Sequence, residues 1–216
     1  MSLRPDPLMI EARDEAYQYF DKNIRSLPKD SEGKIDPTAL GLADNDIDAF
    51  RHAYVSGVFT QIYSEEAADI FGRINEYSPF SWYSDSKRPG SLNMDLWNNG
   101  IGRKYGRKVK NRKELLEIIH EALKNKELIV DPKDNRKYEG KASNSLNKSK
   151  PVIVLKESEK GRNEVFFDLI KNTVLSREEF VASIESGDYP AYSVKIINGL
   201  LTPVSKPDGR KTNNLS

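Results

Sequence analysis

Residues 46–63 read DIDAFRHAYVSGVFTQIY, and this stretch decides the fold. From Ile47 to Ile62 its apolar residues recur at i, i+3, i+7, i+11 and i+15, which is the spacing of one helical face, and one flank of that face is apolar as well. No charged residue stands between Arg51 and Glu65. Because a helix that is apolar around most of its circumference is usually buried, we predict a helix inside the core of the protein.

The rest of the chain carries further helical signals and a few strand signals. We predict helices at 9–25, 65–77, 92–105, 112–125, 162–172 and 177–186, and strands at 127–130 and 152–156. The pair Ser176 and Glu179 is typical of a capping box, and Asn198-Gly199 within an aliphatic run is typical of a two-residue hairpin turn. The expected fold class is mainly α (α+β overall), with a helical lobe and a smaller mixed lobe that contains short strands and a hairpin.

The change from a helical lobe to a mixed lobe with short strands sets the expected domain boundary. The 216 residues are enough for one large domain, or for one domain with a small lobe. We assign residues 1–126 to a helical domain that carries the candidate site, and residues 127–216 to a small α+β lobe. We expect the C-terminal tail to be disordered from about Lys206.

The composition excludes several classes of protein. Hydrophobic residues make up 37% and charged residues 31%, which is polar for a globular protein but too apolar for a chain that is disordered throughout. The absence of cysteine excludes disulfides and thiolate metal sites. The first residues lack the apolar stretch of a signal peptide, and no run approaches the ~20 apolar residues of a membrane span. We therefore expect a soluble protein, either cytoplasmic or exported without a cleavable signal peptide.

The predicted core helix carries an unexpected polar stripe. Asp48, His52 and Ser56 are spaced i, i+4 and i+8, so they share one side of the helix, and Arg51 lies beside them. A carboxylate one turn before an imidazole can accept its N–H, which leaves the other ring nitrogen available as a base or a metal ligand. These groups need partners, because unpaired burial costs about 1–3 kcal/mol for a neutral group and more for a charge.

A second polar stripe can supply those partners. Asp95, Asn99 and Arg103 repeat the i, i+4, i+8 spacing, in a stretch rich in asparagine and glycine that is poorly suited to a purely structural helix. If the two stripes face each other, they form a compact set of carboxyl, imidazole, amide and guanidinium groups. The candidate catalytic residues are Asp48, Arg51, His52, Asp95, Asn99 and Arg103, and the candidate substrate-binding residues are Ser56, Trp97 and Asn98.

The same two stripes have a purely structural interpretation, in which a buried hydrogen-bond network sets how two helices pack. A divalent cation, Mg²⁺ or Ca²⁺, is a further option for the aspartates. An EF-hand calcium loop starting at Asp44 is excluded, because Ala49 and Val55 stand where that loop needs a glycine and a glutamate.

These motifs resemble those of a poorly characterised bacterial family of helical domains. The resemblance rests on DIDAFRHA at residues 46–53 and on MDLWNNGIGR at residues 94–103, and it covers roughly residues 9–106. Members occur alone and as C-terminal modules of secreted, wall-associated or polymorphic-toxin-like proteins. The resemblance implies a site at Asp48, Arg51, His52, Asp95, Asn99 and Arg103, and it does not specify a reaction.

We therefore expect a hydrolase of bacterial effector or toxin type that acts on a phosphoester, lipid ester or cell-wall bond, with His52 as general base. Two non-catalytic alternatives remain open. The basic stretch Arg103–Lys113 could bind nucleic acid or an anionic surface, with Tyr105 available for stacking. The chain could instead bind a protein partner, with the polar stripes as a structural network.

Overall fold

The computed structural model describes residues 5–77, 89–140, 150–158, 161–171, 173–207 and 215, and it divides into two compact units. The first unit is Met1–Asn144 and the second is Ser145–Ser216. The division therefore falls later than the boundary that we expected at 126/127. The physical reason lies in residues 127–138, which the first unit binds along one of its helices.

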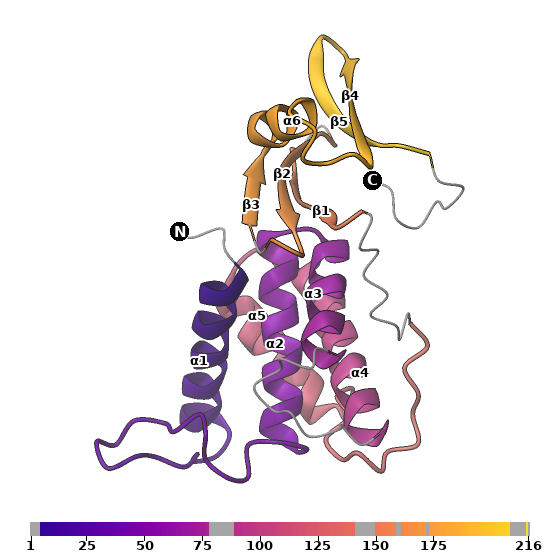
Figure 1. Cartoon of the computed structure of the whole chain (residues 1–216). Helices are drawn as coiled ribbons and strands as arrows, with labels where there is room; N and C mark the ends of the chain where they lie inside the picture. Colours follow the sequence, from indigo (N-terminus) through magenta and orange to yellow (C-terminus); the bar gives the residue numbers. More distant parts are fainter. Residues whose placement is uncertain are drawn as a thin grey trace. The chain divides into compact units, whose positions relative to one another are not determined.

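The first unit is a group of helices that lie side by side (Figure 1). They are α1 (Pro5–Asn23), α2 (Asp46–Ile62), α3 (Glu65–Tyr77), α4 (Pro89–Gly106) and α5 (Arg112–Lys124). The helices expected in this part of the chain are confirmed, with ends that shift by a few residues. Within the described ranges, no helix is both long and apolar enough to cross a membrane.

Helix α2 is the buried helix that its sequence predicts. Its side chains Phe50, Tyr54 and Val58 are fully buried. The ring of Phe50 stacks on Tyr19 of α1 at a centroid distance of 5.7 Å and meets Phe20 edge-on at 5.6 Å. The apolar face of α2 is therefore packed against α1, which leaves its polar stripe to meet other helices.

Helices α2 and α4 touch backbone to backbone through small residues. A Cβ added to Gly102 would lie 2.0 Å from the carbonyl oxygen of Ala53, and one added to Gly106 would lie 2.5 Å from that of Gly57. The contacts advance together along both helices, from His52 with Asn99 to Gly57 with Gly106, so α2 and α4 run in the same direction. This close approach brings the two polar stripes within hydrogen-bonding reach.

Residues 127–140 come after α5 and lie along α4 as an irregular segment. The strand expected at 127–130 does not form. The side chain of Asn98 donates to the carbonyl of Ile129 at 2.8 Å and accepts its N–H at 3.0 Å. Asn93 makes the same pair of bonds to the carbonyl of Arg136 and the N–H of Tyr138, both at 2.9 Å. The two carboxamides take the place of a neighbouring strand, so the segment has its backbone partners without forming a sheet.

The second unit contains two small antiparallel sheets and one helix. Strands β1 (Val152–Glu157), β2 (Asn163–Asp168) and β3 (Thr173–Ser176) form one sheet in that order, and β4 (Tyr192–Ile197) pairs with β5 (Leu200–Ser205). Helix α6 (Arg177–Glu185) begins with the predicted capping box, and the predicted hairpin turn at Asn198-Gly199 joins β4 to β5. The expected tail beyond Lys206 falls largely outside the described residues.

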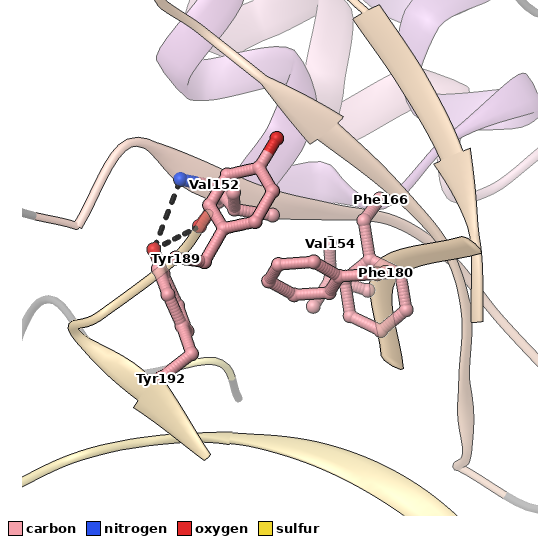
Figure 2. Packing of buried hydrophobic residues seen from close by; sticks show 6 residues of the cluster. All are labelled: Val152, Val154, Phe166, Phe180, Tyr189 and Tyr192. Atoms are coloured by element: carbon pink, nitrogen blue, oxygen red, sulfur yellow. Dashed lines mark hydrogen bonds between the residues drawn. The ribbon is translucent and has the colours of Figure 1, made fainter. Parts of the chain in front are cut away.

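The helix expected at 162–172 is wrong, because that stretch forms β2 and the turn after it. Residues 163–168 form a strand because they pair with β1 on one side and β3 on the other. This pairing places the ring of Phe166 in the core of the unit, with its centroid 4.9 Å from that of Phe180. Asp168 then ends the strand, because its carboxylate accepts the N–H groups of Ile170 and Lys171 at 2.8 Å each. Figure 2 shows this core, with the hydroxyl of Tyr192 facing the backbone of Val152.

The contact between α2 and α4 makes a direct prediction. We expect Gly102→Ala to lower the free energy of unfolding by about 3 kcal/mol, because the new methyl group would collide with backbone that cannot move independently. Urea denaturation of the full chain measures this loss. The matched control is Gly100→Ala on the same helix, where the new Cβ would lie 3.4 Å from Tyr138 in ordinary contact. This control should be neutral or gain up to about 1 kcal/mol, and equal stability of the two variants would contradict the packing described here.

Candidate functional site

Asp48 is held in the first turn of α2 by the loop that precedes it. Asn45 caps the helix, and its side-chain oxygen accepts the N–H of Asp48 at 3.3 Å. Asp44 adopts a left-handed backbone conformation with φ of 57° and donates its N–H to Asp48 Oδ2 at 2.8 Å. Aspartate tolerates this conformation better than most residues, and the helix N-terminus favours a nearby anion. The Asp48 carboxylate is therefore fixed in place before any other helix contributes.

His52 is buried one turn further along α2, with polar groups at both ring nitrogens. Its Nδ1 lies 3.3 Å from Asn99 Oδ1 of α4. Its Nε2 lies 3.3 Å from Asp95 Oδ1, 3.5 Å from Asp48 Oδ1 and 2.9 Å from Arg51 Nη2. Because a carboxamide oxygen can only accept a hydrogen bond, Nδ1 carries a proton and donates to Asn99. Nε2 is then the ring nitrogen that carries no proton in the neutral imidazole.

Arg51 and Asp48 form an ion pair inside this group, in which Arg51 Nη2 donates to Asp48 Oδ1. Burial alone would raise the pKa of Asp48, but Arg51, His52 and the Asp44 amide together hold that pKa below its ordinary value. Burial alone would likewise lower the pKa of the Arg51 guanidinium, but Asp48 holds it above its ordinary value. Each partner thus favours the charged form of the other at neutral pH.

We call Asp48, Arg51, His52, Asp95 and Asn99 the polar cluster. Arg51 is the most exposed member, with 23% of its side chain accessible, and the other four are buried. The cluster therefore brings together two carboxyl groups, one guanidinium and one imidazole. Burying charged groups costs several kcal/mol for each ion unless they are well paired, and groups perturbed in this way gather at functional sites.

Three members of the polar cluster have the chemistry of a metal site. One ligand atom from each of Asp48, His52 and Asp95 lies within 4.8 Å of the others. Arg51 Nη2, however, bonds to Asp48 Oδ1 and lies 2.9 Å from His52 Nε2. A divalent cation held by these three side chains would therefore have to displace a positively charged guanidinium.

Arg103 is not part of the polar cluster, although its spacing placed it on the same stripe as Asn99. Its Nη2 lies 3.0 Å from Asp69 Oδ1 of α3 and donates to the Tyr138 hydroxyl at 3.1 Å. Asp69 also accepts from Arg73 Nε at 2.9 Å. The reasoning from sequence missed Asp69 and Tyr138. The i, i+4 pair of Asp69 and Arg73 was a usable signal, whereas nothing in the sequence points to Tyr138.

The candidate substrate-binding residues divide between two surroundings. Trp97 donates its indole N–H to the Glu127 carbonyl at 2.9 Å, and Asn98 is bonded to the Ile129 backbone, so both hold the segment that follows α5. Ser56 is buried on α2 one turn beyond His52. Within the described part of the chain its Oγ has no hydrogen-bond partner. Ser56 is therefore the one of the three whose side-chain polar group is not used by the described part of the chain.

The basic stretch Arg103–Lys113 is largely engaged within the first unit. Its ion pairs join Arg103 to Asp69, Lys104 to Glu127, Arg107 to Glu65, and Arg112 to both Glu11 and Glu15. The Lys104 and Lys108 ammonium groups also lie 4.8 Å and 5.4 Å from the centre of the Tyr105 ring. These contacts reduce the charge and the aromatic surface that the stretch could offer to a nucleic acid.

Comparison with known proteins places the chain in a family but does not name an activity. No curated protein and no solved structure matches it. The model of a family described as a domain of unknown function, DUF6973, matches residues 10–127, which is more than half of the chain and includes the whole polar cluster. This agrees with the resemblance to a poorly characterised family that the motifs indicate. The chain therefore belongs to the DUF6973 family.

Proposed function

We propose that the protein is a hydrolase of bacterial effector or toxin type, in which His52 is the general base. The observation that carries the proposal is the position of His52, whose Nδ1 lies at Asn99 while its Nε2 faces Asp48, Asp95 and Arg51. A helix that packs on its neighbours through apolar side chains does not need an aspartate, an arginine and a histidine on its remaining side. Their concentration around one imidazole is typical of a site that moves protons.

The contacts of the ring assign a role to each neighbour. Asn99 accepts the Nδ1 proton, which orients the ring and leaves Nε2 as the base. When Nε2 takes a proton from a water molecule, the carboxylates of Asp95 at 3.3 Å and Asp48 at 3.5 Å stabilise the resulting imidazolium. In the structure Nε2 is next to Arg51 Nη2, so the base becomes available when a substrate draws the guanidinium toward itself.

This role of Arg51 favours an anionic substrate or an anionic transition state. A guanidinium pairs with a phosphate or with a developing oxyanion through fixed N–H donors, and burial strengthens that pairing. A phosphoester fits best, and a lipid ester or a cell-wall bond remains within the proposal. The buried hydroxyl of Ser56 is a further candidate donor to the substrate.

A non-catalytic role is the main alternative, because the same groups also satisfy one another as a structural network. The two readings predict different behaviour for His52. A structural imidazole can be replaced by another side chain that preserves the hydrogen bond to Asn99, whereas a general base cannot be replaced by a group that does not accept a proton.

The variant His52→Gln tests this difference. We expect it to lower kcat by at least about 100-fold, because the carboxamide can bond to Asn99 but cannot act as a base. Turnover is measured for the full chain on an aryl phosphodiester, a phospholipid and a peptidoglycan fragment, and urea denaturation reports stability. The matched control is His120→Gln, which changes the other histidine of the chain, located on α5 beside Tyr19.

Two outcomes would contradict the hydrolase proposal. One is an active wild-type protein whose His52→Gln variant retains full turnover. The other is a folded wild-type protein that hydrolyses none of the three substrates, while His52→Gln changes stability alone. The second result would assign the polar cluster to packing.

The position of Arg51 also makes a prediction about metals. Because the guanidinium supplies the positive charge of the cluster, we expect turnover by the wild type to persist in EDTA. The variant Arg51→Ala should gain affinity for a divalent cation, since it removes that charge from Asp48, His52 and Asp95. Added Mg²⁺, Ca²⁺ or Mn²⁺ should therefore raise the Tm of Arg51→Ala and leave the Tm of wild type unchanged.

The control for this experiment is Arg103→Ala, which removes a guanidinium that lies outside the polar cluster. Its Tm should not respond to the cations. If EDTA abolishes wild-type turnover and Mg²⁺ or Ca²⁺ restores it, the guanidinium does not fill the cation's role and the cluster is a metal centre.

A further inference from the structure

We propose that the β4–β5 hairpin of the second unit inserts its end into the surface of an anionic lipid bilayer. The residues that flank its turn are Ile196, Ile197, Leu200 and Leu201, and we call these four the hairpin tip. They are exposed by 74%, 45%, 39% and 47% respectively. Four large aliphatic side chains that adjoin one another at a single turn form an exposed apolar feature of the kind that marks an interaction site.

The hairpin tip is apolar on both faces. Ile196 is paired with Leu201 and Ile197 with Leu200 in the antiparallel register. Successive residues of a strand point to opposite faces, so each of these pairs occupies a different face. A hairpin that docks on a protein surface needs one apolar face, because its other face remains in water. A lipid bilayer surrounds an inserted tip and therefore covers both of its apolar faces at once.

The rest of the hairpin holds this end away from the core of the unit. The turn residues Asn198 and Gly199 have φ of 51° and 77°, the left-handed values that a tight two-residue hairpin turn requires. At the other end, Tyr192 is buried and its hydroxyl lies 3.0 Å from the backbone nitrogen of Val152 (Figure 2). Burial decreases along β4 from Tyr192 to Ile197, so the tip is a preformed projection.

The charges of the hairpin match an anionic surface. Lys195 adjoins the tip and is exposed, whereas Lys206, which is also exposed, follows β5 at the opposite end of the hairpin. Residues 189–207 contain no aspartate or glutamate, so no carboxylate within this stretch opposes binding to anionic headgroups. A two-stranded hairpin has open edges whose backbone groups need water, which limits insertion to the headgroup and upper acyl region. The aliphatic tip with the neighbouring Lys195 suits that depth.

This inference rests on the second unit and does not depend on the proposed hydrolase. Membrane docking can be present in an inactive protein, and hydrolysis can occur without docking. The two proposals therefore fail separately.

The experiment measures binding of the full chain to phosphatidylcholine vesicles with and without phosphatidylglycerol. We expect binding to vesicles that contain phosphatidylglycerol, and a fall of at least about tenfold in partitioning for Ile196→Ser/Leu201→Ser, because apolar burial in the bilayer is lost. The matched control is Ile170→Ser, which changes an isoleucine of the same unit that is 60% exposed and lies in another turn. This control should bind as the wild type does. Circular dichroism checks that all three proteins are folded.

A second measurement locates the contact. Since the chain contains no cysteine, Leu200→Cys and Ile170→Cys each provide a single position for an environment-sensitive dye. Vesicles should shift the emission of the dye at 200 to shorter wavelength and leave the dye at 170 unchanged.

Three results would overturn the inference. They are absence of binding to both kinds of vesicle, equal binding of wild type and the double variant, and equal binding to vesicles with and without phosphatidylglycerol. A dimer in lipid-free solution that the double variant converts to a monomer would also overturn it, because a second copy of the chain would then be the occupant.

Discussion

The backbone contact between α2 and α4 is the constraint on which the rest of the first unit depends. Gly102 lies so close to the carbonyl of Ala53 that no side chain fits between the two helices at that point. Because the helices run in the same direction from this contact, Asp48 and His52 are placed opposite Asp95 and Asn99. With a larger residue at the contact, the helices would separate, and the contacts of His52 with Asn99 and Asp95, both at 3.3 Å, would become too long for hydrogen bonds.

The polar cluster is a consequence of this geometry and explains why the site can be both buried and charged. Asp48 accepts hydrogen bonds from the Asp44 amide and from Arg51, and His52 Nε2 lies 3.5 Å from its Oδ1. His52 in turn takes its partners from both helices. A cluster in which an imidazole has carboxylates and an amide oxygen as neighbours is suited to proton transfer, because the charged form of the ring has groups that stabilise it.

Asparagine side chains have an unusual part in the first unit. Asn98 binds both backbone groups of Ile129, and Asn93 binds the carbonyl of Arg136 and the N–H of Tyr138. Asn99, which follows Asn98 directly, instead orients His52. Asn98 and Asn99 therefore point to different sides of α4. Asn98 holds the segment after α5, and Asn99 contacts His52. The bonds from Asn93 and Asn98 explain why residues 127–138 belong to the helical unit, which extends past the expected boundary at 126/127.

Local sequence was sufficient for α2, the capping box at Ser176, the hairpin turn at Asn198-Gly199 and the i, i+4 spacing of the two polar stripes, because these features depend on residues a few positions apart. The tertiary structure alone decided three other features: residues 163–168 form a strand and not a helix, Arg103 turns to Asp69, and Arg51 lies where a cation would bind. Each of these depends on partners brought together only by folding. Periodicity records which side of a helix a residue occupies, but it cannot record what packs against that side.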